Sequence, residues 1–119
     1  MTDSGPTRVD DFAQKIGHLA WVATEALYPE QPELHARGEA ARERVLEDFE
    51  HHLRALACLN REVFARHVEY CYGMFAHRGF PRAWLDDAWR HMRSVVSREL
   101  EPTIARRACQ ILAAATVDT

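Results

Sequence analysis

The sequence is poor in the features that cross-link or anchor a small protein. Only three of its 119 residues are cysteine (Cys58, Cys71 and Cys109), an odd number without CxxC spacing, which argues against a disulfide framework. Residues 1–11 contain no cationic region followed by an apolar stretch, so no signal peptide is predicted. The apolar runs are also too short to span a bilayer. We therefore expect a cytoplasmic protein with reduced thiols and no membrane partner.

The chain also lacks a large excess of charge of either sign. The chain has 15 basic and 18 acidic residues, a net charge of −3, and no basic block that would contact phosphates, so nucleic acid is not an expected partner. Hydrophobic residues make up 47% and charged residues 28%, which is ordinary globular usage and excludes a fibrous or disordered chain. The length predicts one domain over residues 1–119, with residues 1–8 frayed.

Hydrophobic residues recur with a period near 3.6 along almost the whole chain, and no strand-like alternation is bounded by turns. This pattern predicts an all-α fold, a single compact domain of five to six helices. Pro29, Pro81 and Pro102 mark helix boundaries, Gly79 is the expected C-cap of one helix, and Asn60 suits a cap or turn. The predicted helical segments are Val9–Tyr28, a short turn within Glu33–Arg37, Glu39–Leu59, Arg61–His77, Pro81–Leu100 and Pro102–Ala115.

The sequence has seven histidines, but neither HExxH nor paired Cys and His spacing occurs, so no metal site is predicted. His51 and His52 are adjacent and point about 100° apart on a helix. His52 lies between Phe49 and Leu56 and flanks the buried stripe, whereas His51 points outward. Two interpretations of His52 stay open: a boundary histidine bonded to a backbone group or water, or a contact to a metal or bound chromophore.

The segment Arg61–His77 carries the most suggestive polar group. His67, Tyr70, Cys71 and Met74 occupy neighbouring positions on this helix and can line one wall. A buried imidazole and a buried phenol each need a hydrogen-bond partner, which a ligand would supply. The alternative is that they are amphipathic boundary residues that face water at one end.

Other residues are candidates to complete such a pocket. Trp84 lies off the main apolar stripe of its helix and is a candidate aromatic platform or interface anchor, although aromatics at helical spacing more often belong to the core. Arg54 and Arg78 are solvated charges by default, and either could clamp a carboxylate at a pocket rim. The sequence has no Ser-His-Asp group at recognisable spacing and no Gly-rich phosphate loop. The chain is therefore not expected to be an enzyme.

Three stretches between Val45 and Leu100 share a diffuse pattern without an invariant signature: Phe49-Glu-His-His-Leu-Arg-Ala-Leu, Phe64-Ala-Arg-His-Val-Glu-Tyr and Arg78-Gly-Phe-Pro-Arg-Ala-Trp-Leu. They resemble helical sensor modules of bacteria, including degenerate globin-like domains associated with bilin pigments and cobalamin-type photoreceptors. The helix order is similar to the second half of a globin, in which the helix with the haem-ligating histidine precedes two long antiparallel helices. In that resemblance His52, or His51, corresponds to the ligand.

The resemblance implies a globin-like domain with a tetrapyrrole pocket between its helices and biliverdin as the ligand. A linear tetrapyrrole needs carboxylate clamps for its propionates, polar contacts to its pyrrole nitrogens and aromatic walls for its rings. Cys71 is the cysteine nearest the polar group and could attach the pigment covalently. The candidate cofactor-binding residues are His51, His52, Arg54, His67, Tyr70, Cys71, Met74, Arg78 and Trp84.

Three hypotheses remain open from the sequence. The first is a non-catalytic bilin-binding protein that carries biliverdin or senses light, and the second is a haem-binding globin with His52 as axial ligand, serving gas sensing or redox. The third is a helical interaction domain without a cofactor, whose exposed aromatic residues form a homodimer or partner surface. An absorption spectrum with biliverdin supplied separates them: a red band favours the first, a sharp Soret band the second, and no visible band the third.

Overall fold

Helices account for almost all of the described chain. The computed structural model describes residues 8–116, and within that range no strand is present, which confirms the predicted all-α fold. Each α-helix boundary lies within two residues of the predicted one, whereas the 3-10 helix Tyr28–Glu30 forms in a segment for which no helix is predicted. The predicted fraying of residues 1–8 falls outside the described residues, except at Arg8, which begins the first helix. The elements are α1 (Arg8–Leu27), the 3-10 helix η1 (Tyr28–Glu30), α2 (Pro32–Ala36), α3 (Glu39–Ala57), α4 (Arg61–Arg78), α5 (Arg82–Glu99) and α6 (Pro102–Thr116).

A three-residue turn, residues 58–60, reverses the chain between α3 and α4. Asn60 is the N-cap of α4, and its side chain accepts a hydrogen bond from the Val63 backbone N–H at 3.0 Å. Leu59 adopts a left-handed backbone conformation with a φ of 52° while its side chain is buried. The Leu59 carbonyl accepts a hydrogen bond at 3.0 Å from Arg107 of α6. The turn is therefore fixed by its own cap and by a second helix.

Gly79 ends α4 in the left-handed conformation, with a φ of 74°, as its position in the sequence predicts. The backbone N–H of Phe80 donates to the carbonyl of Phe75 at 2.9 Å, which satisfies a carbonyl that the helix end would otherwise leave unpaired. Pro81 follows as the N-cap of α5, one residue before the first-turn position predicted for it. This sharp stop places Phe80 and the start of α5 beside the end of α4.

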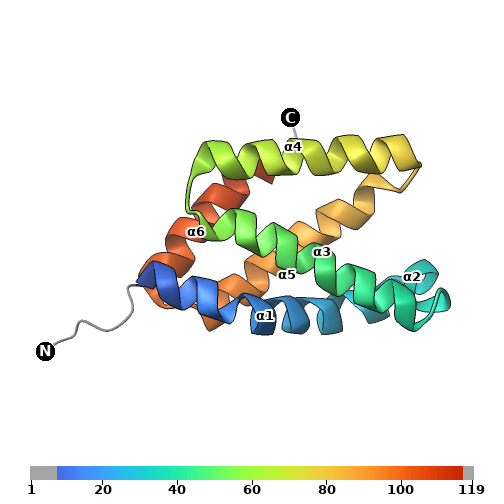
Figure 1. Cartoon of the computed structure of the whole chain (residues 1–119), viewed down its shortest axis with the longest axis horizontal. Helices are drawn as coiled ribbons and strands as arrows, with labels where there is room; N and C mark the ends of the chain where they lie inside the picture. The colour runs from blue at the N-terminus through green and yellow to red at the C-terminus, as the bar shows by residue number, and fades with distance from the viewer. Residues whose placement is uncertain (1–7, 117–119) are drawn as a thin grey trace, which may run out of the picture.

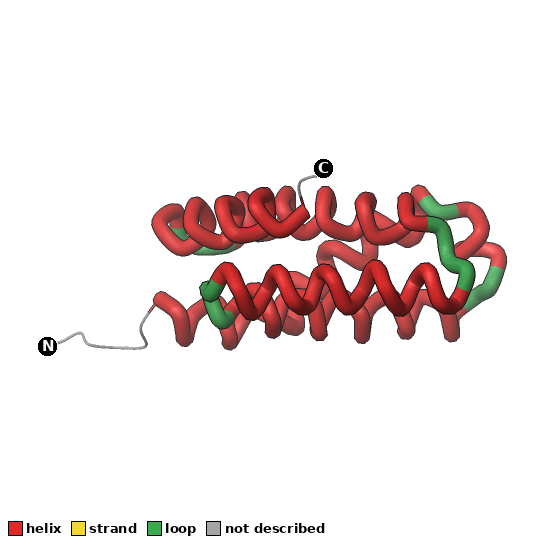
Figure 2. Tube along the Cα trace, turned by 90° about the horizontal axis from the view of Figure 1, so that it is seen from above, coloured by secondary structure: helices red, strands yellow, loops and turns green. Residues whose placement is uncertain are grey.

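The long helices run back and forth between two ends of the molecule, where the loops are gathered (Figure 2). In Figure 1, α1 and α3 lie side by side and run in opposite directions, and α5 crosses behind them. Helix α4 packs more closely against α6 than against α3 or α5. Beyond their short connection α3 and α4 therefore diverge, and a wedge opens between them toward the C-terminal end of α4 (Figure 1).

A single hydrophobic core joins the five long helices. Each contributes a large side chain that is buried: Phe12 from α1, Phe49 from α3, Phe64 from α4, Met92 from α5 and Leu112 from α6. Burial of these apolar surfaces provides most of the stability of such a domain, since isolated helices of this length are marginal in water. None of the helices within residues 8–116 is long and apolar enough to cross a membrane.

Replacing Leu53 by alanine tests the buried face of α3. Leu53 is 1% exposed and belongs to the core, so Leu53→Ala removes buried methyl groups and leaves a cavity. We expect the free energy of unfolding to fall by about 2–5 kcal/mol in urea titrations followed by circular dichroism. Arg54→Ala, at the exposed neighbouring position, is the matched control and should change stability by no more than about 0.5 kcal/mol. Equal stability of the two variants would contradict this placement of the buried face.

Candidate functional site

Two histidines and one cysteine meet in the interior where α3 and α4 are close together. His52 follows Phe49 by three residues on α3, so helical spacing turns it into the core, where it is 6% exposed. His67 and Cys71 lie one turn apart on the facing side of α4. His52 Nδ1 lies 2.8 Å from His67 Nε2, and the Cys71 sulfur lies 3.5 Å from His67 Nε2 and 3.9 Å from His52 Nδ1. We call these three residues the His–Cys cluster.

Aromatic rings enclose the His–Cys cluster. Trp89 of α5 contacts His52 edge to face, with ring centroids 4.7 Å apart, and lies 6.5 Å from the ring of His67. Phe64 packs beside His67 at a centroid distance of 6.1 Å. The indole N–H of Trp89 donates to the Tyr72 hydroxyl at 3.1 Å, which fixes the indole ring. The cluster is therefore held by three helices, with His52 and Cys71 buried and His67 half-buried.

Burial sets the protonation states of the cluster. It lowers the pKa of His52 from 6.5 to about 3, with a smaller contribution from the neighbouring His67, and burial also lowers the pKa of His67. Burial, together with the negative charge of Asp48, raises the pKa of the Cys71 thiol to about 12. At neutral pH the cluster consequently holds two neutral imidazoles and a protonated thiol, an uncharged set that hydrogen-bonds to itself.

This arrangement does not suit a cysteine nucleophile. An activated cysteine has a lowered pKa and is accessible to substrate, because the thiolate is the reactive form. Cys71 is 3% exposed, and burial raises its pKa. Burial therefore works against Cys71 acting as a nucleophile with His67 as its base. The same two properties argue against covalent attachment of a pigment at Cys71.

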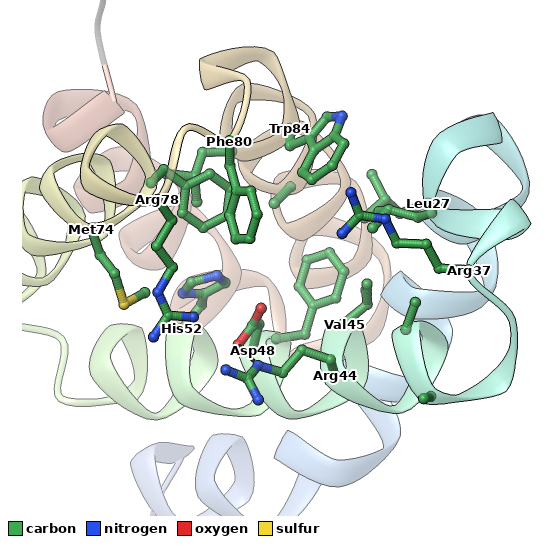
Figure 3. Close-up of a pocket in the computed structure, with 17 residues that line it drawn as sticks. Leu27, Arg37, Arg44, Val45, Asp48, His52, Met74, Arg78, Phe80 and Trp84 are labelled. Carbon is green, nitrogen blue, oxygen red and sulfur yellow. Dashed lines mark ion pairs between the residues drawn. The ribbon is translucent and has the colours of Figure 1, made fainter.

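A pocket of about 390 Å³ fills the wedge between α3 and α4 (Figure 3). Its interior is largely apolar and aromatic, and the ring of His52 forms part of its wall, so the pocket adjoins the His–Cys cluster. Residues of α2 and of the start of α5 also line the pocket. The lining residues are Leu27, Leu34, Arg37, Ala40, Ala41, Arg44, Val45, Asp48, Phe49, His52, Met74, Phe75, Arg78, Phe80, Trp84, Leu85 and Ala88.

Three arginines surround this pocket, which we call the arginine-rimmed pocket. Arg37 follows α2, Arg44 lies on α3 and Arg78 ends α4, and Figure 3 shows their side chains around the pocket with Asp48 between them. The Arg37 guanidinium lies 5.8 Å from the ring centroid of Trp84. Arg44 forms an ion pair with Asp48 at 4.0 Å, and burial raises the pKa of the Asp48 carboxyl. The formal charge at the rim is positive, since Asp48 offsets only one of the three arginines.

The structure brings some of the predicted site residues together and separates others. His67 and Cys71 contact His52 in the His–Cys cluster, while four predicted residues (His52, Met74, Arg78 and Trp84) line the arginine-rimmed pocket. The other three predicted residues lie outside both places: Tyr70, which is 66% exposed, and the exposed residues His51 and Arg54. The four residues predicted to form one wall of α4 therefore lie in three places. His67 and Cys71 belong to the cluster, Met74 lines the pocket, and Tyr70 is at the surface.

Sequence reasoning missed three charged residues of the pocket: Arg37, Arg44 and Asp48. Arg44 and Asp48 are spaced one turn apart and flank the buried positions Val45 and Phe49, so their place beside the apolar stripe of α3 can be read in the sequence. Arg37 gives no comparable signal, because its position depends on how the short helix α2 folds back over α3.

Comparison with known protein families, with curated proteins and with solved structures gave no significant match. The functional interpretation of this chain therefore depends on its own residues, and the resemblance to globin-like bilin-binding domains stays a prediction.

The buried His52 predicts an acid-sensitive fold. Its pKa is about 3 in the folded chain, against 6.5 for an ordinary histidine, so the unfolded chain takes up the proton first as the pH falls. The free energy of unfolding is thus highest above about pH 6.5 and decreases as the pH falls toward about 3, with His52 accounting for about 2 kcal/mol between pH 7.5 and pH 5.

Urea titrations at the two pH values measure this loss. His52→Gln, which does not titrate, should lose less stability on acidification than the unmodified chain. His77→Gln, an exposed position on α4, leaves His52 in place and should show the full loss. Identical pH dependence in all three proteins would show that His52 is not the group responsible.

Proposed function

We propose that this chain is a non-catalytic binding protein that holds an apolar, carboxylate-bearing small molecule in the arginine-rimmed pocket, with the linear tetrapyrrole biliverdin as the specific candidate. The observation that carries the proposal is the arrangement of Arg37, Arg44 and Arg78 around an apolar interior. Ligand sites in proteins are concave and mostly apolar, with a few polar groups that fix orientation, and their volumes begin at about 300 Å³. The arginine-rimmed pocket is concave and mostly apolar, and its volume of about 390 Å³ lies above that lower limit.

The residues of the pocket match the parts of such a ligand. Guanidinium groups bind carboxylates through two parallel hydrogen bonds, so the rim suits the two propionates of a tetrapyrrole. Phe80 and Trp84, with ring centroids 5.6 Å apart, provide an aromatic wall. His52 supplies a polar edge to the pocket. This ligand chemistry also explains why cationic side chains are placed beside an apolar cavity.

Haem is a second candidate, favoured by the setting of His52. Histidines that bind a metal usually hydrogen-bond through their other ring nitrogen, which fixes the orientation of the ring. His52 Nδ1 is engaged by His67 at 2.8 Å, and the same ring lines the pocket. His52 would hold the haem iron and the arginines would hold its propionates. The absorption spectrum separates the two candidates, because bound haem gives a Soret band and bound biliverdin a red band.

Removal of two rim arginines tests the proposed site. We expect the Arg44→Ala, Arg78→Ala double variant to bind biliverdin at least about tenfold more weakly than the unmodified chain in absorption titrations, because two carboxylate partners are lost. Arg54→Ala and Arg66→Ala, exposed arginines of α3 and α4 outside the pocket, are the matched controls and should bind as the unmodified chain does.

Biliverdin dimethyl ester sharpens this test. Its propionates carry no charge, so the double variant and the unmodified chain should bind the ester with nearly equal affinity. His52→Ala should shift the visible band of bound biliverdin, since it removes a polar group from the pocket wall. The pocket is excluded as the site if the unmodified chain and the double variant bind biliverdin and haemin with the same affinity.

A further inference from the structure

We infer that His52, His67 and Cys71 form a binding site for a thiophilic d10 cation, the chemistry shared by Zn²⁺ and Cu⁺, at the point where α3 and α4 converge. The site is distinct from the arginine-rimmed pocket, although His52 belongs to both. The inference goes beyond the proposed function and does not depend on it, because two of the three donors lie outside the pocket lining.

The spacing of the donor atoms is close to that of a metal site. The His52 Nδ1, His67 Nε2 and Cys71 sulfur atoms all lie within 4.8 Å of one another. Zinc–nitrogen bonds of about 2.0–2.1 Å and a zinc–sulfur bond of about 2.3 Å place tetrahedral donors about 3.3 Å apart for two nitrogens and about 3.6 Å apart for nitrogen and sulfur. The corresponding distances here are 2.8 Å, 3.5 Å and 3.9 Å. The imidazoles must separate by about 0.5 Å to admit the ion.

The donor types select the class of metal. A thiolate with two imidazoles is a soft to borderline set that favours zinc and copper over magnesium and calcium, which prefer oxygen ligands. The three donors come from two helices that the core already holds in place, so little ordering is required on binding. Three protein donors leave a coordination position for water when the ion is Zn²⁺, whereas Cu⁺ is satisfied by three.

Binding of an ion to the cluster releases one proton. A neutral imidazole offers a lone pair without losing a proton, so each histidine can bind the ion in the tautomer that leaves its facing nitrogen unprotonated. The Cys71 thiol must lose its proton, so one proton is released for each ion bound: the S–H bond breaks, a sulfur–metal bond forms and the proton passes to solvent. Affinity should therefore increase about tenfold for each unit of pH in the range where the thiol of the metal-free protein is protonated.

The competing interpretation is a buried triad that only satisfies its own hydrogen bonds. Every buried side-chain nitrogen or oxygen within the described residues has a hydrogen-bond partner, so metal is not needed to satisfy the cluster. The two interpretations differ in one measurable property. A hydrogen-bonded triad has no particular affinity for Zn²⁺ or Cu⁺, and a metal site does.

The test uses the full chain, freed of metal by a chelator and kept reduced. Co²⁺ takes the ligands of Zn²⁺ and absorbs visible light, so it is titrated first, then displaced with Zn²⁺; Cu⁺ is titrated separately without oxygen against a chromophoric chelator. We expect one Co²⁺ per chain, with visible bands of a tetrahedral ion and a near-ultraviolet thiolate band. We also expect Zn²⁺ to raise the melting temperature.

Matched variants assign the ligands. Cys71→Ser and His67→Gln should each weaken binding at least about 100-fold and abolish the metal-dependent rise in melting temperature. Cys58→Ser and His77→Gln, exposed residues of the same types, should leave both unchanged. Circular dichroism of the metal-free variants reports whether they fold, and the thiolate band in Co²⁺ spectra of His67→Gln reports Cys71 separately.

The inference is overturned if the unmodified chain binds Co²⁺, Zn²⁺ and Cu⁺ no more tightly than Cys71→Ser does. Failure here is distinguishable from failure of the proposed function. The Arg44→Ala, Arg78→Ala double variant keeps all three metal donors, so it should retain metal binding even where it loses biliverdin.

Discussion

The close approach of His52 and His67 is the contact on which the architecture of this region depends. Their ring nitrogens lie 2.8 Å apart, so α3 and α4 are held together at this level, fewer than two helical turns from the turn that connects them. Beyond this level α3 and α4 diverge toward the C-terminal end of α4 (Figure 1). Helix α2 and the start of α5 cover the resulting wedge without filling it, and the pocket is the space that remains. The contact between these two polar side chains thus lies between a closely packed region and the pocket.

The packed region around the His–Cys cluster places polar groups among apolar and aromatic side chains. An imidazole in the interior costs free energy unless each nitrogen that is removed from water finds a partner, and a charged imidazole costs far more. Mutual hydrogen bonding among neutral groups meets that requirement, while Trp89, tied to Tyr72, closes the cluster on the side of α5. The same burial that keeps the imidazoles neutral keeps the thiol protonated. Burial therefore makes the cluster unsuited to nucleophilic catalysis yet rich in neutral donor atoms.

Much of the fold is predictable from local signals, whereas the site is predictable only in part. Helical periodicity, the prolines and Gly79 place every α-helix boundary within two residues, and the short turn at Asn60 correctly indicates that His52 and His67 can meet across two antiparallel helices. Tyr70 shows where such reasoning ends. At about 100° per residue it lies about 60° from His67 on the side opposite Cys71, so a helix that buries Phe64, Val68 and Cys71 leaves it at the surface. Prediction of the pocket requires the angle between α3 and α4, and the spacing of residues in the sequence does not specify that angle.

His52 links the cluster to the pocket, because its Nδ1 atom faces the cluster while its ring forms part of the pocket wall. A change in the position or the charge of the His52 ring therefore affects both the cluster and the pocket. If the proposed ligand contacts the ring, it is expected to act on the contacts of His52 with His67 and Cys71, and an ion on Nδ1 would change the charge that the pocket presents to a carboxylate. By thermodynamic linkage the influence is reciprocal: if occupancy of one site strengthens binding at the other, the second strengthens the first by the same factor. A positive ion behind His52 would add to the field of the three arginines, so the expected sign of this coupling for an anionic ligand is favourable.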